Sequence, residues 1–423
     1  MTGTTVTERQ TMTRKLIVRL RLLVCLLTII TCSAGAQAVD HPSYALINAY
    51  IFNGLDEQII SGKTILVRNG SIESIVDSSA DVPAGYSVID CEGRYLLPGL
   101  FDVHTHLETL EQAARALASG VTTIRTAGVP AYQDVAMAAL AKAGTIPGPD
   151  VVAAGVYVTP RLEETLLADP RMVPLASGVE SDEDLRLLVK INLDHGVAVI
   201  KTRGTERAGR ADTDPREQVY TQHQLEVVVD EARKGGIAVM VHAHGDEGAR
   251  AAVLAGARSI EHGSYLETDT LKLMKARGTW LVPTYITMLE MLEEEYEGAL
   301  RVRGTYMVPR LEKVIQQAHE LGVPIATGAD NYYDAQSVNR ISLEAWHLVR
   351  LGLSPFEALQ AATVNSAELL MLAERTGRIE TGFEADMILV PSNPLEDISA
   401  LQDILLVMSN GQLALKRIPF ARP

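Results

Sequence analysis

The residues of this chain that could bind a metal ion stand where short apolar runs end. One run finishes with His104-Thr105-His106. In a β-strand, side chains two positions apart point to the same face, with Cα atoms about 6–7 Å apart. One ion could therefore be held by both imidazoles. Similar apolar runs end at Lys201, His242, His262 and Asp330.

Each of these positions also has an ordinary structural explanation. The histidines could be core residues with satisfied ring nitrogens, Lys201 could extend to solvent at a sheet edge, and Asp330 could cap a helix. Coincidence alone explains poorly why ligand-type residues follow one apolar run after another. The sequence therefore predicts one buried metal centre assembled from several strands.

Lys201 adds a special possibility to this centre. Burial pushes a lysine toward its neutral amine, which is nucleophilic enough to capture CO₂. The resulting carbamate would supply a carboxylate that bridges two cations. His244 shares the strand face of His242 and is the candidate for a substrate contact.

The elements that position these residues alternate along the middle of the chain. Helical spacing covers residues 108–118, 222–234, 246–255, 267–277 and 309–321, with strand-like runs between them. Ser354-Pro355-Phe356-Glu357 has the capping-box pattern with proline at the first helical position. Repeated β/α units over residues 95–376 predict an α/β fold with a parallel sheet, and the length fits a TIM-type (β/α)8 barrel. In that barrel, chemistry lies at the carboxyl ends of the strands.

Both ends of the mature chain have a different sequence pattern, which is typical of β-strands. Residues 39–94 and 377–423 contain short alternating segments broken by turn sequences such as Asn69-Gly70 and Asn410-Gly411. We expect both ends to build one small β-sandwich domain, with the metal-binding barrel of residues 95–376 inserted between them.

Residues 1–38 are typical of a secretory signal peptide. A basic stretch leads into a short apolar run, and Ala36-Gln37-Ala38 forms a small-residue cleavage site. The apolar run is shorter than the ~20 residues of an ordinary membrane span. A secreted or periplasmic protein without a stable membrane span in its mature form is expected. Lipid attachment at Cys32, as in a lipoprotein, is the alternative.

The composition and net charge limit the classes of partner that this protein could bind. The chain has 423 residues and a net charge of −15, which becomes −19 once the five basic residues and one acidic residue of the signal are removed. Such an acidic protein is a poor partner for nucleic acid or an anionic membrane, so a small-molecule substrate is expected. Cys91 is the one cysteine outside the signal, which leaves metal ligation to nitrogen and oxygen donors. A homo-oligomer is compatible with these features.

Motifs along nearly the whole mature chain resemble those of the amidohydrolase superfamily. The similarity is greatest to its prolidase-like, imidazolonepropionase-related branch of metal-dependent dipeptidases and carboxypeptidases. It is carried by Leu97-Pro98-Gly99-Leu100-Phe101-Asp102, Gly120-Val121-Thr122-Thr123-Ile124-Arg125, His242-Ala243-His244-Gly245, Ser259-Ile260-Glu261-His262-Gly263 and Gly382-Phe383-Glu384-Ala385-Asp386-Met387.

The resemblance implies a binuclear zinc site. His104, His106 and Asp330 would hold one Zn²⁺, His242 and His262 the other, and carbamylated Lys201 would bridge the two divalent metal ions. Hydroxide shared by the metals would attack an amide carbonyl, and Asp330 would carry its proton to the departing amine. Tyr220 matches a tyrosine of some relatives that could stabilise the oxyanion.

Two departures from the family pattern put the substrate in doubt. Relatives have a Gly-Gly-His segment where this chain has Gly155-Val156-Tyr157, and a glycine pair after the lysine where it has Thr202-Arg203-Gly204. Arg203 or Arg207 could clamp a substrate carboxylate, and the alternative is that both are exposed loop charges.

We expect cleavage of an amide C–N bond in a dipeptide or N-acyl amino acid. The alternatives are a cyclic amidase or aminohydrolase, a phosphotriester or lactone hydrolase, and a metal-binding protein without enzymatic activity.

Overall fold

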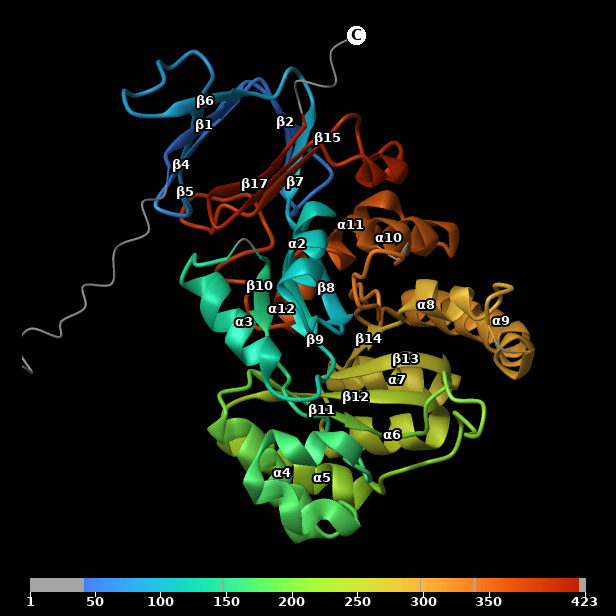
Figure 1. Cartoon of the computed structure of the whole chain (residues 1–423). Coiled ribbons are helices and arrows are strands. Elements are labelled where there is room, and N and C mark those ends of the chain that lie inside the picture. Colours follow the sequence, from blue (N-terminus) through green and yellow to red (C-terminus); the bar gives the residue numbers. More distant parts are fainter. Residues whose placement is uncertain (1–41, 147, 297, 338–339, 418–423) are drawn as a thin grey trace, which may run out of the picture. The chain divides into compact units, whose positions relative to one another are not determined.

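The computed structural model describes residues 42–146, 148–296, 298–337 and 340–417 (Figure 1). The predicted signal peptide lies outside the described residues. Within them, no helix is long and apolar enough to span a bilayer.

Strands from both ends of the chain form one antiparallel-rich sheet. Its order is β17 (Gln412–Lys416), β16 (Leu406–Ser409), β15 (Met387–Val390), β7 (Tyr95–Pro98), β2 (Tyr50–Phe52) and β3 (Ile59–Ile60). A second sheet has the order β5 (Ser71–Asp77), β4 (Lys63–Arg68), β1 (Tyr44–Ile47) and β6 (Ser87–Asp90). The apolar side chains of both sheets share one buried cluster, which includes Leu46, Ile65, Leu96 and Met387. Residues distant in sequence thus bury one another.

The turns of these sheets follow the chemistry of their residues. The predicted turn at Asn69-Gly70 joins β4 to β5, and the one at Asn410-Gly411 joins β16 to β17. All four residues have positive φ, between 48° and 82°. Asparagine and glycine tolerate this conformation, which tight hairpins require at both central positions. Both turn predictions are confirmed.

The middle of the chain contributes parallel strands. One sheet contains β8 (Leu100–Thr105), β9 (Val121–Thr126) and β10 (Asp150–Val152), and another contains β11 (Val199–Arg203), β12 (Ala238–Gly245), β13 (Ser259–Tyr265) and β14 (Trp280–Val282). The predicted mixed α/β class with parallel strands is confirmed.

Backbone contacts join the two parallel sheets at both edges. Val158, beyond β10, forms a parallel bridge with Thr202 of β11. On the other side, Leu281 of β14 forms a parallel bridge with Ile325. The same segment then reaches β8, because the Asp330 amide donates to the His104 carbonyl over 2.6 Å. The segment that carries Asp330 is therefore fixed directly beside the strand that carries His104.

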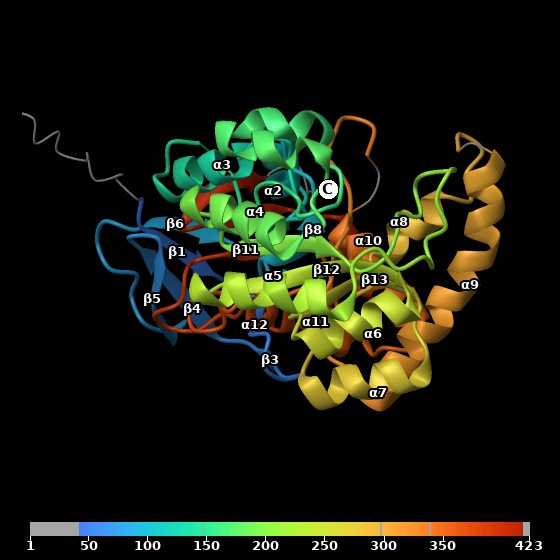
Figure 2. The same cartoon turned by 90° about the horizontal axis from the view of Figure 1, so that it is seen from below.

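Helices follow the strands in alternation. They are α2 (Leu110–Ala118), α3 (Gln133–Lys142), α4 (Asp182–Asp194), α5 (Gln222–Lys234), α6 (Asp246–Ala255), α7 (Thr268–Arg277), α8 (Tyr285–Glu290), α9 (Gly298–Leu321), α10 (Ile341–Arg350), α11 (Pro355–Ala361) and α12 (Val364–Leu369). Short 3₁₀ segments are η1 (Glu163–Ala168), η2 (Pro170–Ser177) and η3 (Ile398–Gln402). Consecutive helices from α4 to α7 pack side by side (Figure 2).

Most helix boundaries agree with the sequence signals. The predictions over 222–234 and 246–255 coincide with α5 and α6, and Ser354 caps α11 through the expected box with Glu357. The helix predicted over 309–321 is wrong at its start, because α9 begins at Gly298 and contains Pro309. Proline inside a helix removes a backbone donor, but packing of the long helix evidently offsets that cost.

Candidate metal centre

The first group of candidate ligands joins β8 to the segment after Ala329. His104 and His106 each direct Nε2 toward Asp330 Oδ1, at 3.4 and 3.2 Å. One ligand atom from each of the three residues lies within 4.8 Å of the others. His104 is buried, whereas His106 and Asp330 remain partly exposed. A cation between them would have access from one side.

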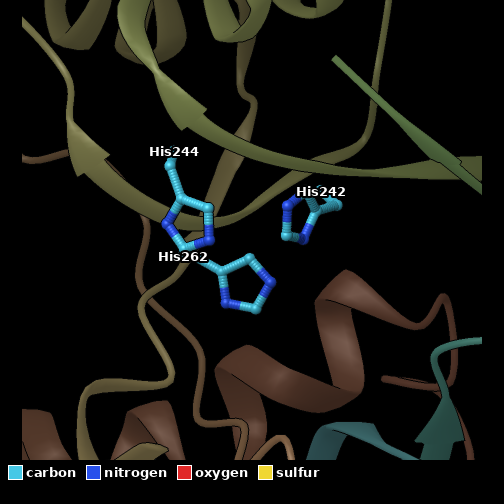
Figure 3. A group of neighbouring side chains, drawn as sticks. All are labelled: His242, His244 and His262. Atoms are coloured by element: carbon cyan, nitrogen blue, oxygen red, sulfur yellow. The ribbon is translucent and has the colours of Figure 1, made fainter. Parts of the chain in front are cut away.

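The second group comes from adjacent strands β12 and β13. His242, His244 and His262 also place one ring nitrogen each within 4.8 Å of one another. Figure 3 shows the three imidazoles gathered around a common space. The ring centroid of His262 lies 4.6 Å from that of His242 and 4.7 Å from that of His244. All three residues are buried.

The two groups adjoin, with Lys201 beside them. The ring centroids of His104 and His262 are 4.9 Å apart, and Asp330 Oδ2 lies 3.9 Å from His262 Nδ1. Lys201 Nζ lies 3.5 Å from His104 Nε2. All six residues predicted to bind metal therefore converge.

Most of the histidine rings are held by a partner on Nδ1. The pairs are His104 with Glu261 Oε2 at 2.7 Å, His106 with the Gly128 carbonyl at 2.9 Å, His244 with Ser264 Oγ at 2.9 Å, and His262 with Thr284 Oγ1 at 2.7 Å. Such partners set the ring orientation and leave Nε2 to a cation, as around many protein metal sites.

His244 is a candidate metal ligand as well as the predicted substrate contact. Spacing within β12 predicted that it shares the face of His242, and the two ring centroids are 4.8 Å apart. His244 belongs to the same ligand-capable group, while His242 Nε2 lies 3.1 Å from the Glu206 carbonyl. Its predicted contact with substrate stays a prediction.

Burial makes these side chains suitable as neutral ligands. Burial lowers the pKa of His104 to about 4 and that of His244 to about 3, and it holds the pKa values of His242 and His262 well below 6.5. The imidazoles are therefore unprotonated at neutral pH, the form that binds metal.

The pKa values of the two remaining candidates, Lys201 and Asp330, are also shifted. Burial lowers the pKa of Lys201 to about 7, against the opposing charges of Glu261 and Asp330. A substantial share of neutral amine is thus present at neutral pH. Burial would raise the pKa of Asp330, but His104, His106 and His262 hold it well below 3.8. Neutral imidazoles around an ionised carboxylate fit a divalent cation such as zinc.

Backbone conformation at the centre departs from ordinary strand geometry. His262 has φ 74° and Asp330 has φ 45°, and both values lie in the left-handed region that side chains other than glycine rarely adopt. Conformations of this kind cost roughly 1–3 kcal/mol and concentrate at functional sites.

Sequence reasoning missed two residues, Arg125 and Glu261, that hold the His104 ring in place. Arg125 of β9 donates from Nη2 to Glu261 of β13 at 2.9 Å, and neither side chain is more than 2% exposed. Both residues lie within the quoted motifs, and a charge inside an apolar strand was the available signal. Strict alternation would put Glu261 and His262 on opposite faces. The left-handed turn at His262 allows both to reach the site.

Arg203 and Tyr220 lie beside the centre rather than in the two ligand groups. Arg203 is 8% exposed and pairs with Glu206 at 3.3 Å. Tyr220 donates its hydroxyl proton to the Val179 carbonyl at 2.8 Å, and burial raises its pKa. An oxyanion contact from Tyr220 would require breaking that hydrogen bond, so this role stays a prediction.

The fold and the site define a mixed α/β protein with a histidine-rich candidate metal centre at its strand ends. Residues 95–414 match the model of the amidohydrolase family. The chain belongs to this family, and it is a hydrolase that acts on carbon–nitrogen bonds. The predicted family is confirmed.

Individual relatives place the chain in the prolidase-like branch. It is 28% identical over 384 residues to ochratoxinase of Aspergillus niger, covering 80% of this chain and 79% of that protein. A crystal structure of a Xaa-Pro dipeptidase with bound methionine superposes with a TM-score of 0.79 and 26% identity, covering 88% of this chain and 99% of the other. A protein assigned as a prolidase from Bifidobacterium longum gives 0.78 and 31%, with 88% and 94% covered.

Proposed function

We propose that this protein is a metal-dependent amidohydrolase that cleaves the amide bond of a dipeptide or N-acyl amino acid with the help of two divalent cations. The observation that carries this proposal is the convergence of the two ligand groups, with Lys201 Nζ 3.5 Å from His104 Nε2. The names of the relatives, a dipeptidase and an ochratoxinase among them, agree with amide hydrolysis.

The proposed architecture completes the family fold. β8 to β14 and the segment at residues 324–327 would close into a TIM-type barrel, and residues 39–94 and 377–423 would form the composite β-sandwich domain. Support comes from the bridges of Val158 with Thr202 and of Leu281 with Ile325, which join successive parallel segments. Such a closure would put every candidate ligand at one rim.

The candidate ligands divide between two cations. His104, His106 and Asp330 would hold one cation, and His242 and His262 the other, with His244 as a further available donor. Lys201, carbamylated by CO₂, would lie between the two. Bound zinc ions would lower the pKa of water toward about 7 and polarise the amide carbonyl.

The chain's own residues would then manage the proton. The depressed pKa of Asp330 keeps its carboxylate ionised at neutral pH, and its side chain is 19% exposed. Asp330 would accept the proton of the attacking water and return it to the leaving amine nitrogen. Glu261, paired with Arg125, would keep His104 oriented throughout.

We also propose export of the protein through the signal peptide at residues 1–38, with activity in a secreted or periplasmic compartment. The basic stretch, the short apolar run and the Ala36-Gln37-Ala38 site support this reading.

A substrate screen tests the proposed activity. Zinc-loaded protein is incubated with dipeptides, N-acyl amino acids and cyclic amides, and products are followed by mass spectrometry. Release of a free amino acid is expected, with metal-depleted protein as the control. Ring opening, ammonia release or complete inactivity on the acyclic substrates would reject the proposed substrate class.

A further inference from the structure

The structure brings together two segments at which the sequence departs from the family pattern. Tyr157 stands in the segment after β10, and Arg203 ends β11. The Arg203 guanidinium lies 5.0 Å from the centroid of the Tyr157 ring. Two changes far apart in sequence therefore contact each other in space.

This pair adjoins the candidate metal centre. Arg203 and Lys201 are two positions apart in β11, so their side chains leave the same face of the strand. Lys201 Nζ lies 5.6 Å from the centroid of the same Tyr157 ring. The tyrosine ring thus contacts the predicted metal bridge as well as the arginine.

Both side chains have unused hydrogen-bonding capacity. Among the described residues, the enclosed Tyr157 hydroxyl and Arg203 Nε have no hydrogen-bond partner. Arg203 is 8% exposed, and leaving a buried charged donor unpaired is costly.

The charges around the pair favour an anion. The Arg207 guanidinium lies 5.4 Å from the Tyr157 ring centroid, which places a second arginine at the same ring. Glu206 is the acidic partner of Arg203, at 3.3 Å. Two guanidinium groups beside one carboxylate leave an excess of positive charge next to the metal centre, in a protein whose net charge is −15.

On the basis of the proposed function, we propose that Arg203 and Tyr157 bind the free carboxylate of the amino acid released from the substrate. The guanidinium edge with Nε would donate charge-assisted hydrogen bonds to the carboxylate, and the Tyr157 hydroxyl would donate to an oxygen of the same group. The substrate class is therefore an N-acyl amino acid or a dipeptide with a free C-terminus.

The spacing suits such a substrate. Lys201 and Arg203 have Cα atoms about 6–7 Å apart, as expected for alternate strand residues. In an N-acyl amino acid the scissile carbonyl carbon and the carboxylate carbon are separated by three covalent bonds and lie within about 4 Å. A carboxylate at Arg203 would therefore leave the scissile carbonyl beside the cations near Lys201.

Discrimination between an acid and its amide tests this subsite. Cleavage of the acyl bond is measured for N-acetyl-L-leucine and N-acetyl-L-leucinamide, which differ in the carboxylate. Wild type should prefer the acid by about 10-fold or more in kcat/KM, because charged hydrogen bonds are lost with the amide. Arg203→Gln should lower the acid-to-amide ratio to near unity, mainly through KM for the acid, and Tyr157→Phe should lower it severalfold.

Controls separate binding from structure. Arg210 lies in the same loop with an exposed side chain paired to Asp212, so Arg210→Gln should retain the wild-type ratio. A purely structural effect of Arg203→Gln would reduce both substrates equally and overturn the proposal. If that variant does not fold, Tyr157→Phe, which keeps the ring, decides the question alone.

A binding measurement distinguishes failure of the subsite from failure of the proposed function. Calorimetry with the slow Asp330→Asn variant compares the binding of the same acid and amide. If the variant binds the acid more tightly than the amide but the wild-type protein hydrolyses neither compound, the subsite is supported and the amidase function is rejected. Equal binding of both would reject the subsite, whatever the activity.

Discussion

At the scale of single residues, burial makes these side chains chemically useful. Removal from water lowers the pKa of His104 to about 4 and that of Lys201 to about 7. The same burial would be unfavourable for isolated charges. Here, the partners on Nδ1 and the carboxylate of Asp330 satisfy the polar atoms, so a cation can replace protons as the positive charge.

Lys201→Ala should lower the metal content of the protein and abolish most of its activity. Without the neutral amine there is no carbamate to lie between the two cations, and added bicarbonate cannot restore it. Elemental analysis and turnover of the purified variant measure both effects. Lys190→Ala, an exposed lysine on α4, is the matched control. Wild-type turnover of Lys201→Ala would refute the bridging role.

Asp330→Asn should retain substantial metal but lower kcat at least about 100-fold, since an amide cannot accept the proton. The remaining donors, His104 and His106, explain the retained metal. Steady-state kinetics with elemental analysis gives both quantities. The exposed Asp334→Asn should behave as wild type. An unchanged kcat in Asp330→Asn would remove this residue as the acid–base.

At the scale of elements, the centre depends on how closely the segment before Asp330 packs against β8. A Cβ added at Gly328 would lie 2.8 Å from His104 Cβ and 2.8 Å from Val282 Cγ1. Real carbon atoms do not approach this closely without movement, so glycine is required for the segment at Gly328 to pack against both β8 and β14. Packing between elements thereby sets the position of a ligand.

Gly328→Ala should displace His104, weaken metal binding at least about tenfold and destabilise the protein by about 1–3 kcal/mol. Competition with a chelator and urea denaturation measure the two effects. Gly209 has nothing within 4 Å of an added Cβ, so Gly209→Ala is the control. Equal metal affinity in the two variants would show that β8 tolerates the displacement.

At the scale of the whole molecule, both chain ends are tied into one β core. Asp386, immediately before β15, is 3% exposed. Its carboxylate accepts hydrogen bonds from the backbone N–H of Asn410 and from the hydroxyl of Thr376, both at 2.7 Å. Burial and then the charge of Asp150 raise its pKa to about 7 from 3.8. The folded state therefore binds a proton more tightly than the unfolded chain.

This shift predicts a pH-dependent stability. Because the folded pKa is raised, the contribution of Asp386 is complete below about pH 4 and declines as pH rises to about 7. Asp386→Asn mimics the protonated side chain, so its free energy of unfolding relative to wild type should rise by roughly 1–3 kcal/mol between pH 5 and pH 8. Urea denaturation at both pH values measures it, and a pH-independent difference would contradict the shift.

Export makes a prediction for the intact chain. The mature protein should begin near Val39, because cleavage is expected after Ala38. Mass spectrometry of the exported protein determines its first residue. Exported material that still carries residues 1–38 would reject the signal-peptide interpretation.

Sequence alone predicted six candidate metal ligands, and strand periodicity indicated which residues of one strand share a face. His104 with His106, and His242 with His244, follow from that rule. Strand and hairpin signals likewise predicted a mixed α/β chain and its β-rich ends. The start of α9 was predicted wrongly, because proline is common in the first turn of a helix and Pro309 was taken as that start.

Only the tertiary structure decided which strands meet. It joined His244 to the ligand group, placed the Arg125–Glu261 pair beneath His104, and brought Tyr157 against Arg203. Local spacing contains no information about neighbours that are distant in sequence, and the left-handed backbone at His262 breaks the alternation on which sequence reasoning depends. Long-range packing therefore supplied the geometry, while the sequence supplied the chemistry.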